Sequence, residues 1–281
     1  IVSIAKDKEQ PYALTYIFCK HDAYPNNEKG DLTYYIYQYA ANVMQIMLSQ
    51  RLEELAQSAT PPFIQASIYD GDFFLSKTKK ALCGIAVTNE NDLTKGISTV
   101  YREMLRAVRN GFTESEYERA RAEILTHIES AYNERNKVKS ANYCKEYVRH
   151  FIDNEPIPGI ETEYALMNQL APNIPVEAIN SILPQLIKDE NIVINIFGPD
   201  KEGMVYPTEA EILDILNKTK AEEITAYVDK VSDEPLMKEA PKAGKIVKTE
   251  EGPFGSTALT LSNGVRVVLK TTDFKADEIR M

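Results

Sequence analysis

The sequence predicts an α+β protein in which helices are layered on a sheet, and three observations lead to this fold class. Runs rich in aromatic and β-branched residues occur at 12–20, 63–70 and 81–88. Helical patterns are clustered after them, between residues 91 and 187. A continuous apolar run at 191–199 then predicts a buried central strand. Strands and helices therefore come in groups, whereas a doubly wound sheet would alternate them.

The early elements follow from local patterns. The first run, YALTYIFCK, predicts a strand. Asp31 or Thr33 can cap the long helix that follows, in which apolar residues from Tyr39 to Leu52 recur at helical spacing. The next two runs predict a pair of strands joined by a longer connection.

The clearest local signal is a corner between two helices. One helix starts near Asn91 or Asp92 and ends at Asn110–Gly111, where glycine supplies the left-handed residue that follows a helix. Thr113 and Glu116 then form a capping-box pattern that starts the next helix. Further helices are predicted at 137–153, 161–170, 175–187 and 207–216.

Three segments are expected. Residues 1–217 form an α+β domain, and residues 218–256, charged and poor in large apolar side chains, form a linker. Residues 257–281 contain TALTLSNGVRVVLKTT, a hairpin pattern with a turn at Asn263–Gly264. We expect this hairpin to open a further domain that is truncated at Met281. The chain also begins without an initiator Met or a secretory leader, so we expect a segment of a longer protein.

Composition excludes several function classes. The net charge of −10 over 281 residues disfavours nucleic acid as a partner. No apolar run approaches the roughly 20 residues that span a bilayer, so no membrane partner is expected. The three cysteines lack CxxC spacing. Cys19 and Cys83 lie in apolar runs and are predicted to be buried, inert thiols.

The sequence assigns no catalytic, cofactor-binding or metal-binding residue. The phosphate-binding motifs GxxxxGK[ST] and GxGxxG are absent, and so is GxSxG, the motif that carries the nucleophilic serine of many hydrolases. His21, His127 and His150 are far apart, and none has a second His within a helical turn. One alternative stays open: an unrelated enzyme that uses His127, His150 or Cys144 with nearby carboxylates. The tyrosine-rich stretch at 33–39 is interpreted as core packing in preference to a ligand platform.

Three stretches together resemble the non-catalytic domains of pitrilysin-like zinc peptidases, the group that includes insulin-degrading enzyme and the mitochondrial processing peptidases. They are RNGFTESEYERARAEIL, NIVINIFGPDKEG and TLSNGVRVVLKTTDF. The resemblance implies a two-layer fold, with a mostly antiparallel sheet covered on one face by several helices. It also implies a parent protein of four such domains, paired in two halves around a peptide chamber. In that layout, residues 1–217 match the second domain, 218–256 the connection between halves, and 257–281 the start of the third domain.

Two departures from the family bear on function. The zinc-binding HxxEH motif of the first domain is absent, so the segment alone is expected to be inactive and to bind no cofactor. Family members also grip substrate with an Arg and with a Tyr seven residues after it. The best match here begins at Arg51, but the residue seven positions later is Ser58, so this pair is missing. The resemblance therefore implies a non-catalytic, chamber-forming domain of a larger zinc metalloendopeptidase. The implied partners are the other domains and peptide substrate, and relatives with this layout suggest a periplasmic location. The alternative is an inactive scaffold subunit of the same fold.

Overall fold

The computed structural model describes residues 1–89, 92–188, 190–231, 234–235, 237–276 and 278–281. The body of the molecule contains a five-stranded sheet in the order β1-β5-β2-β4-β3. Only β1 and β5 pair in parallel, and the other neighbours are antiparallel. The strands are β1 (Val2–Asp7), β2 (Ala13–Asp22), β3 (Gln65–Asp72), β4 (Lys79–Thr88) and β5 (Ile192–Pro199).

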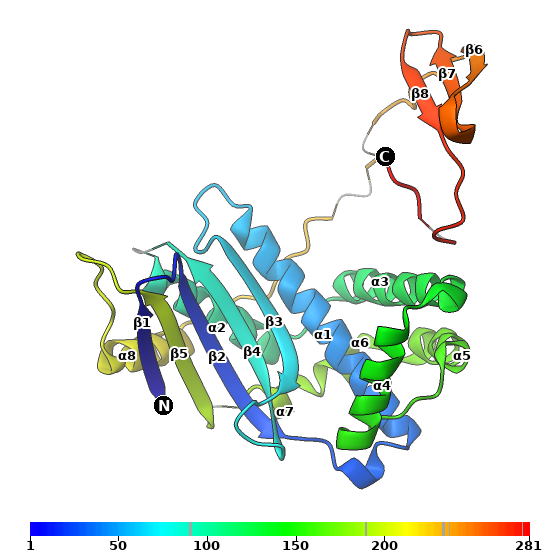
Figure 1. Cartoon of the computed structure of the whole chain (residues 1–281). Coiled ribbons are helices and arrows are strands. Elements are labelled where there is room, and N and C mark those ends of the chain that lie inside the picture. The colour runs from blue at the N-terminus through cyan, green and yellow to red at the C-terminus, as the bar shows by residue number, and fades with distance from the viewer. Residues whose placement is uncertain (90–91, 189, 232–233, 236, 277) are drawn as a thin grey trace.

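The helices lie on one side of this sheet. Figure 1 shows α1 and α2 behind the strands and no helix over the near face. The predicted two-layer α+β fold, mostly antiparallel with helices on one face, is therefore confirmed. The helices are α1 (Leu32–Ala56), α2 (Leu93–Asn110), α3 (Glu114–Asn133), α4 (Ser140–Asp153), α5 (Ile160–Leu170), α6 (Val176–Asn180), α7 (Leu183–Leu186) and α8 (Glu209–Ala221).

The main core forms between the sheet and the helices. Alternate β2 residues such as Ile17 and Cys19 point to it because successive side chains of a strand face opposite sides. From the helices come Met47 of α1 and Met104 of α2, both fully buried. Gly84 of β4 allows α2 to approach closely, since a Cβ there would lie 2.5 Å from a Val100 methyl carbon.

The corner between α2 and α3 has the predicted local structure. Gly111 ends α2 with a φ of +75°, which few residues other than glycine adopt. Thr113 and Glu116 form a complete capping box: the hydroxyl accepts from the Glu116 backbone N–H, and the carboxylate accepts from the Thr113 backbone N–H. Asp92 precedes the first residue of α2, whereas Asn91 lies outside the described residues.

The C-terminal part differs from the sequence expectation in one respect. The predicted hairpin is present as β7 (Thr257–Leu261) and β8 (Arg266–Leu269), with Gly264 in the turn at a φ of +86°. A third strand, β6 (Ile246–Glu251), pairs with β7, although its residues fall inside the predicted linker. Figure 1 shows this three-stranded sheet standing apart from the body.

Candidate functional site

The three histidines do not come together. His127 is exposed on α3, and His150 is exposed near the end of α4, where its Nδ1 lies 2.6 Å from the Glu155 carbonyl oxygen. His21 is buried at the end of β2. Within the described ranges, no three His, Cys, Asp or Glu side chains gather where they could hold a metal ion.

His21 belongs to a small charged cluster that joins three strands. Its Nε2 lies 2.7 Å from Asp70 of β3, and the ammonium of Lys80 of β4 lies 3.3 Å from the same carboxylate. Burial works against ionisation of Asp70, but the hydrogen bond from His21 and the charge of Lys80 outweigh it and lower its pKa. The cluster ties the strand ends together.

A second polar cluster fixes the start of α1. The Glu155 carboxylate accepts hydrogen bonds from Lys29 at 2.8 Å, from Tyr34 at 2.7 Å and from Gln38 at 3.1 Å. Burial opposes ionisation here too, yet the bonds from Lys29 and Tyr34 lower the Glu155 pKa overall. The interpretation of the 33–39 stretch as packing fits the buried Tyr34 and Tyr39.

The predicted burial of Cys19 and Cys83 is confirmed. Cys19 and Cys83 are buried, and burial raises the thiol pKa to about 12 for Cys19 and to about 11 for Cys83. Neither is therefore a nucleophile near neutral pH. Cys144 is exposed on α4.

Arg51 has a structural role that the sequence pattern did not reveal. It is only 2% exposed, and its guanidinium donates to both carboxylate oxygens of Glu116, at 2.6 and 2.9 Å. A further bond, of 3.1 Å, reaches the Gly111 carbonyl oxygen. The capping-box Glu116 was identifiable from sequence, whereas its partner on α1 was not, because their proximity is created by tertiary packing.

The uncovered face of the sheet is apolar. Phe18 and Cys83 sit opposite each other on β2 and β4, and both point away from the main core. Tyr16 stacks on Phe18 with ring centroids 5.8 Å apart, and Phe73 packs edge-on against Phe18 at 5.7 Å. Phe18, Phe73 and Cys83 are themselves buried in this cluster, whereas Phe74, which packs on Phe18, is 73% exposed.

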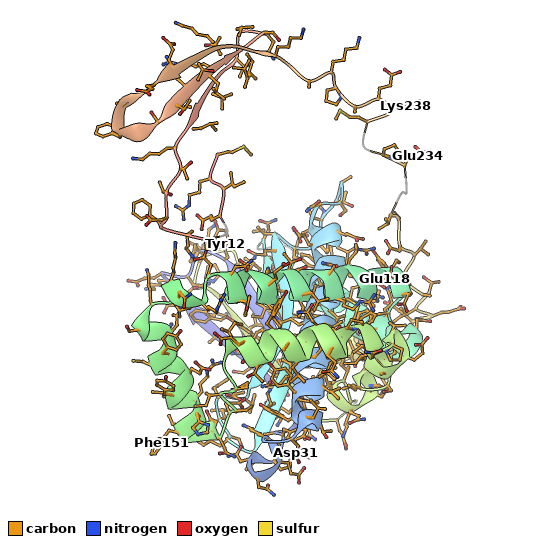
Figure 2. The ribbon with its side chains drawn as sticks, turned by 90° about the vertical axis from the view of Figure 1, so that its right-hand side faces the viewer. Tyr12, Asp31, Glu118, Phe151, Glu234 and Lys238 are labelled. Atoms are coloured by element: carbon orange, nitrogen blue, oxygen red, sulfur yellow. The ribbon has the colours of Figure 1, made fainter. Side chains whose placement is uncertain are left out.

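Helix α4 also turns apolar side chains outward. Glu146 is half-buried and lines a cavity of about 260 Å³ between α4 and the body. On the other side, Tyr147 is 57% exposed and Phe151 is 90% exposed. Figure 2 shows Phe151 on the outer side of α4, away from the body. The apolar stripe of α4 comprises Tyr143, Tyr147, Val148, Phe151 and Ile152.

Comparisons with known proteins relate the chain to one peptidase family. No family model matches it. A zinc protease PQQL-like protein of Arabidopsis thaliana is 34% identical over 172 residues, which are 60% of this chain and 18% of that protein.

Solved structures share the fold. The periplasmic protease PqqL of Escherichia coli has a TM-score of 0.72 at 20% identity, covering 95% of this chain and 29% of its own. The structure of its first half alone, at 17% identity and a TM-score of 0.71, covers 81% of this chain and 48% of its own. A predicted insulinase family protease of Yersinia pestis has a TM-score of 0.64 at 12% identity, over 79% of this chain and 46% of its own.

The chain thus spans less than a third of the Arabidopsis relative and of the complete PqqL chain. In the part of the chain that the structure describes, no helix is long and apolar enough to cross a membrane. In sequence this chain is thus similar to part of a zinc protease, and in fold it is similar to PqqL and to an insulinase family protease.

Proposed function

We propose that this chain is a non-catalytic, chamber-forming domain of a larger zinc-dependent metalloendopeptidase. One observation carries the proposal: a chain similar to part of a zinc protease has no HxxEH motif anywhere in its sequence. The chain's own residues therefore supply neither the two histidines nor the glutamate of that motif. Zinc and the water-activating glutamate belong to a different domain of the parent protein.

We further propose the domain layout 1–217, 218–256 and 257–281, as second domain, connection and start of the third domain. The PqqL structures support it: the first half alone covers 81% of this chain, and the complete protein covers 95%. The difference is close in length to the C-terminal region that holds β6, β7 and β8. This is the pattern expected if that region belongs to the second half.

The two apolar surfaces support a role in packing and in lining a peptide cavity. One sheet face carries an aromatic cluster around Phe18, and α4 exposes Phe151 to solvent. Neighbouring domains of the parent and a bound peptide are the partners that would cover them. The likeness to a periplasmic protease favours an exported protein.

The proposal is tested by comparing the natural full-length protein with this segment in a peptide-cleavage assay. The full-length protein is expected to cleave unstructured peptides, and to lose this activity when either His of its HxxEH motif is changed to Ala. The segment is expected to cleave none. Cleavage by the segment, lost in His127→Ala or His150→Ala, would contradict the proposal. A full-length protein without zinc or activity would favour the scaffold alternative.

A further inference from the structure

The chain after α8 lies against the body. We call residues 222–229 the strap. We call residues 102–119 the α2–α3 corner, because they comprise the end of α2, the turn and the start of α3. Three backbone carbonyl oxygens of the strap accept hydrogen bonds from the last two turns of α2. These bonds run from Arg106 to Thr225 (2.7 Å), from Arg109 to Glu222 (2.9 Å) and from Asn110 to Ile224 (3.2 Å).

An aromatic side chain anchors the middle of the strap. The ring centroid of Tyr227 lies 4.4 Å from the Arg51 guanidinium carbon, and Phe112 contacts the same guanidinium at 4.8 Å. The Tyr227 hydroxyl donates to a carboxylate oxygen of Glu54 at 2.7 Å. Because Arg51 is buried and held by Glu116, this anchor rests on a fixed group.

Ion pairs hold both ends of the strap. Glu222 pairs with Arg102 through two bonds of 2.5 and 2.9 Å. Asp229 accepts from Ser115 at 2.5 Å and from Arg119 at 2.7 Å. Burial opposes ionisation of Asp229, but these two bonds outweigh it and lower its pKa. An arginine of the α2–α3 corner therefore pairs with each end of the strap, Arg102 with Glu222 and Arg119 with Asp229.

We propose that the strap is a fixed part of the body, gripped by the α2–α3 corner, and that the linker predicted from residue 218 therefore begins no earlier than residue 230. The predicted linker would let the chain move from residue 218 onward. With the strap held, the body and the β6–β8 sheet are joined by a shorter tether that leaves from the corner. The corner therefore fixes the point on the body from which the chain continues toward any following domain. This inference does not depend on the proposed function.

Limited proteolysis of the whole chain with a glutamate-specific protease tests the proposal, because cleavage requires a locally unfolded backbone. The side chains of Glu223 in the strap and Glu239 beyond it are both exposed, so Glu239 provides an internal reference. We expect cleavage after Glu223 to be at least about tenfold slower than after Glu239. The double variant Tyr227→Ala/Asp229→Asn removes the central and terminal anchors and is expected to raise the Glu223 rate about tenfold or more.

The control is Tyr147→Ala/Asp214→Asn, which removes the same side-chain types from exposed positions on α4 and α8. It is expected to leave the ratio of the two rates unchanged. Equal rates at Glu223 and Glu239 in the unmodified chain would overturn the proposal. An unchanged Glu223 rate in the Tyr227→Ala/Asp229→Asn variant would overturn the assigned grip.

Discussion

Arg51 and Glu116 form a buried ion pair that joins α1 to the first turn of α3, with both carboxylate oxygens bonded at 2.6 and 2.9 Å. The same carboxylate completes the capping box with Thr113. One glutamate therefore starts a helix and neutralises a buried guanidinium. The arginine in turn supports Tyr227 of the strap.

Replacing Arg51 should lower the stability of the folded chain. Arg51→Met leaves the Glu116 carboxylate buried without its counter-charge, so the free energy of unfolding is expected to fall by about 3–5 kcal/mol. Denaturant unfolding measures this. Lys218→Met, which breaks the exposed pair with Asp214, is expected to cost less than about 1 kcal/mol. Similar losses for the two variants would contradict the role given to Arg51.

Asp70 should make stability depend on pH in the acid range. Its pKa is lowered in the folded protein, so it contributes stability that is full above its unfolded pKa and is lost as pH falls through its folded pKa. The difference in unfolding free energy between the unmodified chain and Asp70→Asn should therefore be constant near neutral pH and shrink below about pH 4.

His21 and Lys80, which pair with Asp70, both remain in that variant. Asp200→Asn removes an exposed carboxylate and controls for the loss of one acidic group. A difference that grows toward low pH would contradict the assigned direction.

Thiol reactivity should separate the cysteines. In the native protein at neutral pH, one thiol per chain is expected to react rapidly with a disulfide reagent, namely Cys144. Cys19 and Cys83 should react only after denaturation, because burial both hides them and raises their pKa. Mass spectrometry of labelled peptides identifies the modified residues. Rapid native labelling of Cys83 would contradict the buried position of that strand.

The apolar stripe of α4 should govern the behaviour of the isolated segment. Phe151→Ser removes an almost fully exposed ring, so it is expected to reduce self-association and dye binding at little cost in stability. Sedimentation velocity and a hydrophobic dye report the two effects. In the full-length protein the same change is expected to lower stability, since there the ring would be covered. Phe254→Ser, in the separate C-terminal sheet region, is a matched control with an 87% exposed ring.

Local patterns predicted local structure well. The α2–α3 corner follows from Gly111 and the Thr113–Glu116 capping box, whose interactions span a few residues. By contrast, β1 was missed, because VSIAKD is short and partly charged and gains its strand character from parallel pairing with β5. A helix was expected over 137–153, and α4 occupies 140–153.

What the sequence could not show is which distant segments pack against one another in the folded chain. Composition correctly marked the region after α8 as polar, but it could not show that the strap is bonded to residues more than a hundred positions earlier. The outward stripe of α4 is similar: its helical spacing was readable, whereas the side that it presents to solvent depends on the body beside it. The lack of a metal-binding motif, in contrast, needed only the sequence.

Zinc content tests the central claim most directly. Inductively coupled plasma mass spectrometry should find one zinc ion per chain in the purified natural full-length protein, and none in residues 1–281 prepared in the same way. Stoichiometric zinc in the segment would contradict the account, as would a full-length protein that cleaves peptides without any bound metal.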